Sequence, residues 1–230
     1  MPLMGYALAT SFDFPPEVAA GIILIGCSPS GLASNVMAYI AKANVALSLT
    51  ITSCATLLAP VLTPLLMKVL GGEFIQVDFF KMMVEILKII ILPIGVGLLI
   101  NKIFRNQAQF LNKYMPLLSM AGIALIICII TAAGRESLLK VGGILVICML
   151  LHNLSGYLLG YWSARLLKLP EQDCSTVAIE VGLQNGGLAS GIALQMGKVA
   201  TVGLAPALFG PIMNVTGSLL ASWWGKKPVK

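Results

Sequence analysis

A carboxylate and two carboxamides lie close together within an otherwise apolar part of the chain, at Glu180, Gln184 and Asn185, and are followed by the glycine pair Gly186 and Gly187. An ionisable residue at membrane depth costs roughly 2.5–3.5 kcal/mol on insertion scales, so it usually marks the path of an ion, a proton or a substrate. Glycines weaken a helix, and a broken helix exposes carbonyls that can ligate a cation and N–H groups that can bind an anion. The stretch therefore predicts an ion-coupled binding site.

The composition of the chain indicates the surroundings of this site. The 230 residues are 58% hydrophobic and 10% charged, and the mean hydropathy is +0.93, which excludes an ordinary soluble domain. Apolar runs long enough to cross a hydrocarbon core of ~30 Å recur along the whole length. We therefore predict an all-α polytopic membrane protein that lies in a lipid bilayer.

The basic residues predict the orientation of the chain. The net charge is +6, but basic side chains occur singly or in small groups between apolar runs, where they set topology, so we expect no nucleic-acid partner. Alternating the loops across the membrane places the larger basic group on the side of the C-terminal tail. The positive-inside rule then predicts a cytoplasmic C-terminus, with a tail that carries Lys226, Lys227 and Lys230.

Breaks in hydropathy divide the chain into expected helices. The first apolar run is too short for a complete span, and two later segments are interrupted by proline or glycine. The expected elements are a half-span at 1–10, an interrupted segment at 18–40, spans at 45–70, 79–100, 114–133 and 141–167, an interrupted segment from about 170 to 196, and a last span at 201–224.

The two interrupted segments share a short sequence. Gly31-Leu32-Ala33-Ser34 recurs as Gly187-Leu188-Ala189-Ser190, and each copy is followed by a short turn and one long span. The loop alternation makes the two segments run in opposite directions, which is the pattern of an inverted-repeat transporter with its site at the membrane midplane. Three spans precede the second copy and only a half-span precedes the first. We therefore expect that about two and a half spans of the first repeat are missing.

Three runs of residues resemble the bile acid:sodium symporter family in its bacterial branch, and the resemblance covers essentially the whole chain. The runs are 26–37, 44–48 and 180–185. The resemblance implies two inverted five-helix repeats in which two discontinuous helices cross inside a core domain, beside a panel domain, in the inner (plasma) membrane. On this mapping residues 1–75 are the partial first repeat, 76–134 are panel helices and 135–230 complete the core.

The resemblance also implies two sodium sites. One would use Ser34, Asn35, Ser48, Thr52 and Glu180. The second would use Glu180, Gln184 and the backbone carbonyls of Val181 and Leu183, together with a glutamine whose place falls before Met1. Hydroxyl, amide and carboxylate oxygens suit a hard cation such as sodium, and Ser48 and Thr52 share one helical face.

The same resemblance implies a substrate cleft between core and panel. Asn185 matches a polar residue of that cleft, and the helix starts after Gly31 and Gly187 could offer N–H groups to a carboxylate. Leu32 stands where bacterial relatives often carry threonine, and Met213 stands before Asn214 where they often carry histidine. The expected substrate-binding residues are Gly31, Leu32, Asn185 and Asn214.

Three functions are compatible with these patterns. The first is a sodium-coupled symporter of an organic anion, of bile-acid or small-carboxylate type, that works by alternating access. The second is an intramembrane enzyme, which the single histidine and the lack of paired acids or Cys/His spacing argue against. The third is a non-transporting remnant, or one part of a split transporter whose missing N-terminal helices belong to a longer or separate chain. For His152 and Asn153 we expect interhelical hydrogen bonds rather than catalysis.

Overall fold

The computed structural model describes residues 1–103 and 108–226. Four helical stretches within this part of the chain are long and apolar enough to cross a membrane, which confirms an all-α polytopic membrane protein. The elements are α1 (Pro2–Ser11), α2 (Pro16–Cys27), α3 (Ala33–Ile40), α4 (Val45–Leu66), the π-helical turn η1 (Met67–Gly71), α5 (Phe79–Ile103), α6 (Ala108–Ala133), α7 (Arg135–Leu166), α8 (Glu171–Gly182), α9 (Gly186–Gln195) and α10 (Leu204–Gly225).

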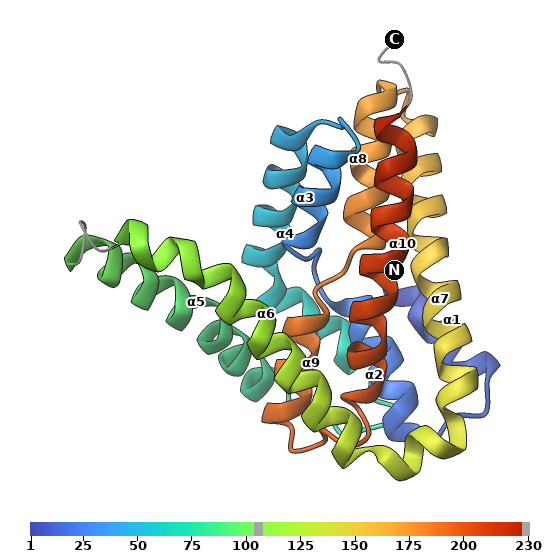
Figure 1. Cartoon of the computed structure of the whole chain (residues 1–230). Helices are drawn as coiled ribbons and strands as arrows, with labels where there is room; N and C mark the ends of the chain where they lie inside the picture. The colour runs from blue at the N-terminus through green and yellow to red at the C-terminus, as the bar shows by residue number, and fades with distance from the viewer. Residues whose placement is uncertain (104–107, 227–230) are drawn as a thin grey trace.

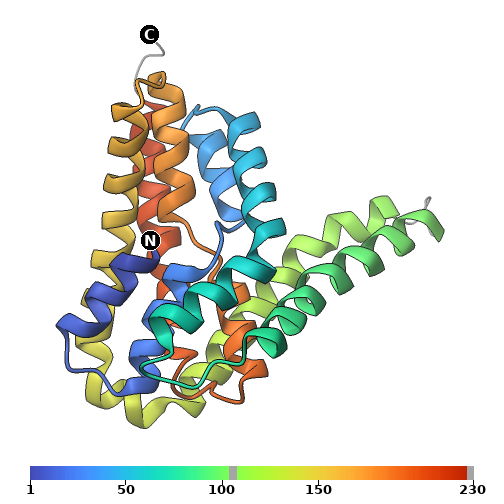
Figure 2. The same cartoon turned by 180° about the vertical axis from the view of Figure 1, so that it is seen from behind.

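Helices α5 and α6 form a hairpin that projects from the other elements (Figure 1). In the remaining bundle α7 packs along α8, and α10 contacts α2, α3 and α9. Figure 2 shows the same separation from behind. The hairpin falls within residues 76–134, and the division of the chain into core and panel stays a prediction.

The two interrupted segments cross as antiparallel chains. α2 and α9 lie in one half of the bundle and α3 and α8 in the other (Figure 1), and Ser30 forms an antiparallel bridge with Gln184. Gly31 N donates to Leu183 O at 2.9 Å, and Asn185 N donates to Pro29 O at 2.7 Å. Each break thus satisfies backbone groups of the other, which a membrane interior requires. The predicted crossing of two discontinuous helices is confirmed.

The repeated motif and the hydrogen bonds of the crossing relate different residues of the two segments. The repeated four-residue motif pairs Gly31 with Gly187, whereas the reciprocal hydrogen bonds relate Gly31 to Asn185, two residues earlier. The glycine pair does not form the break, because Gly186 and Gly187 are the first residues of α9. Asn185 starts this helix by accepting a hydrogen bond from Leu188 N at 2.9 Å, as an N-cap does.

The polar residues between the fifth and sixth expected helices do not form a separate break. The spans expected at 114–133 and 141–167 leave a polar break between them that contains Arg135, Glu136 and Lys140, but α7 begins at Arg135 and only Gly134 separates it from α6. An acidic residue in a first helical turn interacts favourably with the positive end of the helix dipole, and Glu136 occupies that position. The span expected at 141–167 is therefore longer and reaches the end of α6.

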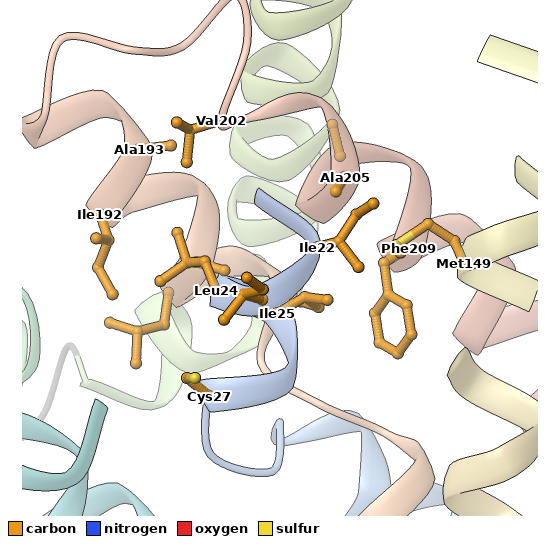
Figure 3. Packing of buried hydrophobic residues seen from close by; sticks show 14 of the residues in the cluster. Ile22, Leu24, Ile25, Cys27, Met149, Ile192, Ala193, Val202, Ala205 and Phe209 are labelled. Atoms are coloured by element: carbon orange, nitrogen blue, oxygen red, sulfur yellow. The ribbon is translucent and has the colours of Figure 1, made fainter. Parts of the chain in front are cut away.

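The half-helix α2 lies at the centre of the bundle. Every residue from Val18 to Cys27 is buried, and Figure 3 shows its side chains between those of α9 and α10. Ile22, Leu24 and Ile25 are fully enclosed. Thr63 Oγ1 of α4 donates to the free carbonyl of Cys27 at 2.8 Å, so the buried end of α2 keeps a partner.

Two glycines let α7 approach α8 closely. Gly156 and Gly160 are four residues apart, which places them on one face of α7. A Cβ atom at Gly160 would lie 2.8 Å from Ala178 Cα, and one at Gly156 would lie 2.9 Å from Gly182 Cα. Small residues at this spacing are typical of tight helix pairs in membranes. This contact holds the helix that presents Glu180.

Candidate functional site

The five residues expected to form the first sodium site lie together where α3, α4 and α8 meet. Ser48 Oγ is 2.5 Å from Glu180 Oε1, and Thr52 Oγ1 is 2.9 Å from Glu180 Oε2. Asn35 Oδ1 is 2.8 Å from Ser48 Oγ, and Ser34 Oγ is 3.3 Å from Thr52 Oγ1. The structure brings all five side chains into one oxygen cluster, and their role as sodium ligands stays a prediction.

Four members of the cluster are buried, Asn35 is half-buried, and the cluster has more acceptors than protons. Glu180 is 3% exposed, and neither ion pair recorded among the described residues includes it. Ser48 Oγ faces both Glu180 and Asn35 but carries one proton, so it can donate to only one of them. A buried carboxylate without a cationic partner is costly. A hard cation bound among these oxygens would balance the charge and use the remaining lone pairs.

Hydrogen bonds between α4 and α8, one helical turn before the cluster, align the two helices. Asn44 caps α4 by accepting from Leu47 N at 3.1 Å, and its Nδ2 donates to Asp173 Oδ1 at 2.9 Å. Asn44 N donates to Thr176 Oγ1 at 2.9 Å. Ser48 follows Asn44 by four residues, and Glu180 follows Thr176 by four residues. The paired starts of α4 and α8 therefore bring Ser48 opposite Glu180.

Two of the residues expected at the second sodium site, Leu183 and Gln184, already have other partners. Gln184 Nε2 donates to Gly26 O at 3.2 Å, and Gln184 Oε1 is 2.8 Å from His152 Nε2. Leu183 O accepts from Gly31 N. Glu180, Val181 and Gln184 line a cavity of about 290 Å³ that Met1 and Pro2 also line. The structure thus places the expected members near one another, although the Gln184 amide and the Leu183 carbonyl are engaged elsewhere.

The four expected substrate-binding residues line a single cavity. Gly31, Leu32, Asn185 and Asn214 surround a volume of about 310 Å³ between α3, α9, α10 and the α6 arm of the hairpin. The α6 wall, which consists of Ile123, Ile126 and Ile127, was not among the expected residues. Their spacing of three and four residues was the available signal, because it places them on one helical face. Among the described residues, none with an ionisable side chain lines this cavity.

Thr52→Val tests the oxygen cluster without changing side-chain shape. Thr52 is 4% exposed, and valine removes the oxygen that lies 2.9 Å from Glu180 Oε2. We expect the sodium concentration that half-saturates thermal stabilisation to rise about tenfold, equivalent to about 1.4 kcal/mol. Thr50→Val on the same helix is the control, since Thr50 is exposed and bonds only to its own helix at Ala46 O. Equal half-saturation in the two variants would exclude Thr52 from the site.

Comparison with known proteins identifies a family and several relatives of this chain. The family model described as "Sodium Bile acid symporter family" matches residues 1–141. The uncharacterized sodium-dependent transporter YocS of Bacillus subtilis (strain 168) is 41% identical over 231 residues, covering 100% of this chain and 71% of YocS. The probable sodium/metabolite cotransporter BASS1 of Arabidopsis thaliana, chloroplastic, is 32% identical, covering 100% of this chain and 57% of BASS1.

A further plant relative is also much longer than the part that this chain matches. The probable sodium/metabolite cotransporter BASS2 of Oryza sativa subsp. japonica, chloroplastic, is 33% identical over 97% of this chain and 53% of its own length. The chain thus spans a little more than half of these plant relatives. All three relatives are named as transporters or cotransporters, which supports a non-enzymatic role. The chain belongs to the Sodium Bile acid symporter family.

Proposed function

We propose that this chain carries out sodium-coupled symport of an organic anion. The observation that supports this best is the buried Glu180 carboxylate, enclosed by hydroxyl and amide oxygens where two broken helices cross. The names of the relatives support sodium dependence. Sodium would be the co-transported ion, and the substrate would be a carboxylate of bile-acid or smaller size.

Coupling would pass through the crossing itself. Gly31 N and Asn185 N bond across the two breaks, and both residues also line the cavity proposed for the substrate. A sodium ion that holds α3, α4 and α8 together would therefore order the cavity wall. Each cation that enters down a potential of 100 mV contributes about 2.3 kcal/mol to the transport cycle.

The transport movement would be a displacement of the bundle relative to the hairpin. In this proposal residues 1–75 and 135–230 form the core, 76–134 form the panel, and alternating exposure of the cavity between them moves the substrate. The chain would lie in the inner (plasma) membrane with its C-terminus in the cytoplasm. Lys226 ends the described tail, and Lys227 and Lys230 lie outside the described residues.

Uptake into proteoliposomes tests the proposal. Vesicles containing the purified chain would be given an inward sodium gradient and radiolabelled taurocholate or pantoate as probes, with an inward potassium gradient as control. We expect uptake of at least one probe that requires sodium and that collapses when the gradient is dissipated. Uptake that is equally fast with potassium would contradict sodium coupling.

A second proposal concerns the length of the chain. Because the chain covers 71% of YocS and 57% of the plant BASS1, additional helices from a longer or separate chain could complete the panel. A chain without them would be a non-transporting remnant that binds sodium but moves no probe. Co-expression with the N-terminal part of YocS tests this, and uptake that appears only in the combination would support a split transporter.

A further inference from the structure

Two consecutive buried residues of α7 bond to the break between α8 and α9. His152 and Asn153 are both 0% exposed. His152 Nε2 lies 2.8 Å from Gln184 Oε1, and Asn153 Nδ2 donates to Gly182 O at 2.8 Å. The interhelical hydrogen bonds expected for this pair are confirmed. Both partners lie within four residues of Glu180, so the two bonds act on the end of the helix that carries the carboxylate.

The hydrogen-bond pattern assigns the proton on His152. The Gln184 amide nitrogen donates to Gly26 O at 3.2 Å, so its Oε1 must accept the bond from the ring. His152 therefore carries its proton on Nε2, while Nδ1 is buried and has no hydrogen-bond partner among the described residues. The His152 imidazole ring packs against the Phe209 ring in a T-shaped arrangement, with 5.7 Å between the ring centroids. The His152 Nε2–H group thus orients the Gln184 side chain. In this orientation the Gln184 amide bonds to Gly26 O near the end of α2.

Asn153 links the break to the wall of the substrate cavity. Its Oδ1 accepts from Thr216 Oγ1 of α10 at 2.5 Å, while its Nδ2 donates to the carbonyl that ends α8. Thr216 lies two residues beyond Asn214, which lines the cavity. The Asn153 amide therefore joins a freed carbonyl of the crossing to the helix that carries Asn214.

We propose that His152 and Asn153 are positioning residues that hold the α8 break in its ion-binding geometry. The inference rests on the proposed sodium coupling and goes beyond it, because neither residue belongs to the oxygen cluster around Glu180. His152 acts through Gln184, and Asn153 acts through the Gly182 carbonyl and Thr216. Loss of either bond leaves a buried polar group of the break without its partner, which favours other conformations of that backbone.

The test compares His152→Phe with His152→Gln and with Met149→Leu. Phenylalanine keeps a ring against Phe209 but removes the donor, and glutamine restores an N–H donor. Met149 is equally buried on α7, one turn away. We expect His152→Phe to raise the half-saturating sodium concentration about tenfold and His152→Gln to restore it to within about threefold, with Met149→Leu unchanged. Asn153→Leu and Thr216→Val test the second link, with the same expected direction.

Hydrogen exchange supplies a readout that needs no sodium. The amides of Gly31 and Asn185 bond across the two breaks, so His152→Phe should speed their exchange about tenfold relative to amides in the middle of α7. Combining His152→Phe with Gln184→Met should add nothing to the Gln184→Met effect if the histidine acts through the glutamine. If His152→Phe does not fold, Gln184→Met alone breaks the same bond and should accelerate the same amides.

The outcomes separate the inference from the proposed function. Absence of any sodium response in the unmodified chain would contradict sodium coupling, while the exchange data would still decide the positioning role. Suppose that the unmodified chain responds normally to sodium, that His152→Phe and Met149→Leu respond alike, and that amide exchange at Gly31 and Asn185 is unchanged. This result would overturn the positioning role of His152 and leave the proposed sodium coupling intact. A general loss of stability that His152→Gln does not repair would also overturn it, because ordinary core packing would then account for the effect.

Discussion

Glu180→Gln is expected to remove the sodium-specific stabilisation of the purified chain. A bound ion stabilises a fold in proportion to the logarithm of its concentration above the dissociation constant. The substitution keeps the side-chain shape but removes the charge that a cation would balance among Ser48, Thr52 and Asn35. We expect the half-saturating sodium concentration to rise at least about 100-fold, equivalent to about 2.7 kcal/mol. Thermal unfolding in sodium and in potassium chloride at equal ionic strength measures it.

The same variant has an opposite expected effect in potassium. Because the carboxylate is buried and pairs with no cationic side chain in the part of the chain that the structure describes, its neutral replacement should unfold at the same temperature as the unmodified chain or higher when sodium is absent. Glu171→Gln, at the exposed start of the same helix, is the matched control and should keep the full sodium response. An unchanged sodium response in Glu180→Gln would remove Glu180 from the ion site.

Gly160→Val is expected to destabilise the bundle by about 3 kcal/mol, at the upper end of the usual range for overpacking. The added Cβ would lie 2.8 Å from both Ala178 Cα and Val177 O, and these backbone atoms can yield only if α8 moves away from α7. Since α8 carries Glu180, sodium stabilisation should weaken as well. Denaturant unfolding in detergent, followed by helical circular dichroism, gives the change in free energy.

Gly143→Val provides the control for the intrinsic effect of valine in α7. A Cβ atom at Gly143 would have nothing within 4 Å, so the substitution should change stability by less than about 1 kcal/mol. The difference between the two variants isolates the helix contact. Equal stability of Gly160→Val and Gly143→Val would show that the close approach of α7 and α8 does not hold the fold.

The class of the protein follows from its amino-acid sequence alone, and the sequence also predicts an ion-coupled centre. Hydropathy predicts membrane helices because a bilayer tolerates only long apolar segments with internally bonded backbones. Pro29 with its neighbours, and the glycine pair Gly186 and Gly187, predict two breaks, because proline and glycine weaken helical hydrogen bonding locally. The carboxylate and the two carboxamides at Glu180, Gln184 and Asn185 indicate an ion-coupled site. All of these signals are local, so they can be read from a few neighbouring residues.

How the two breaks meet depends on contacts between distant segments of the fold. The pairing of Gly31 with Leu183 and of Asn185 with Pro29 joins residues about 150 positions apart, and local periodicity does not encode such a register. The position of the second break depends on the same long-range contacts. The sequence predicted the break at Gly186 and Gly187, whereas in the structure Asn185 caps α9 and the glycine pair begins that helix. The partners of Gln184 likewise depend on α7 and α2 meeting at one point. Reciprocal backbone bonds between distant segments, rather than local helix propensity, determine this geometry.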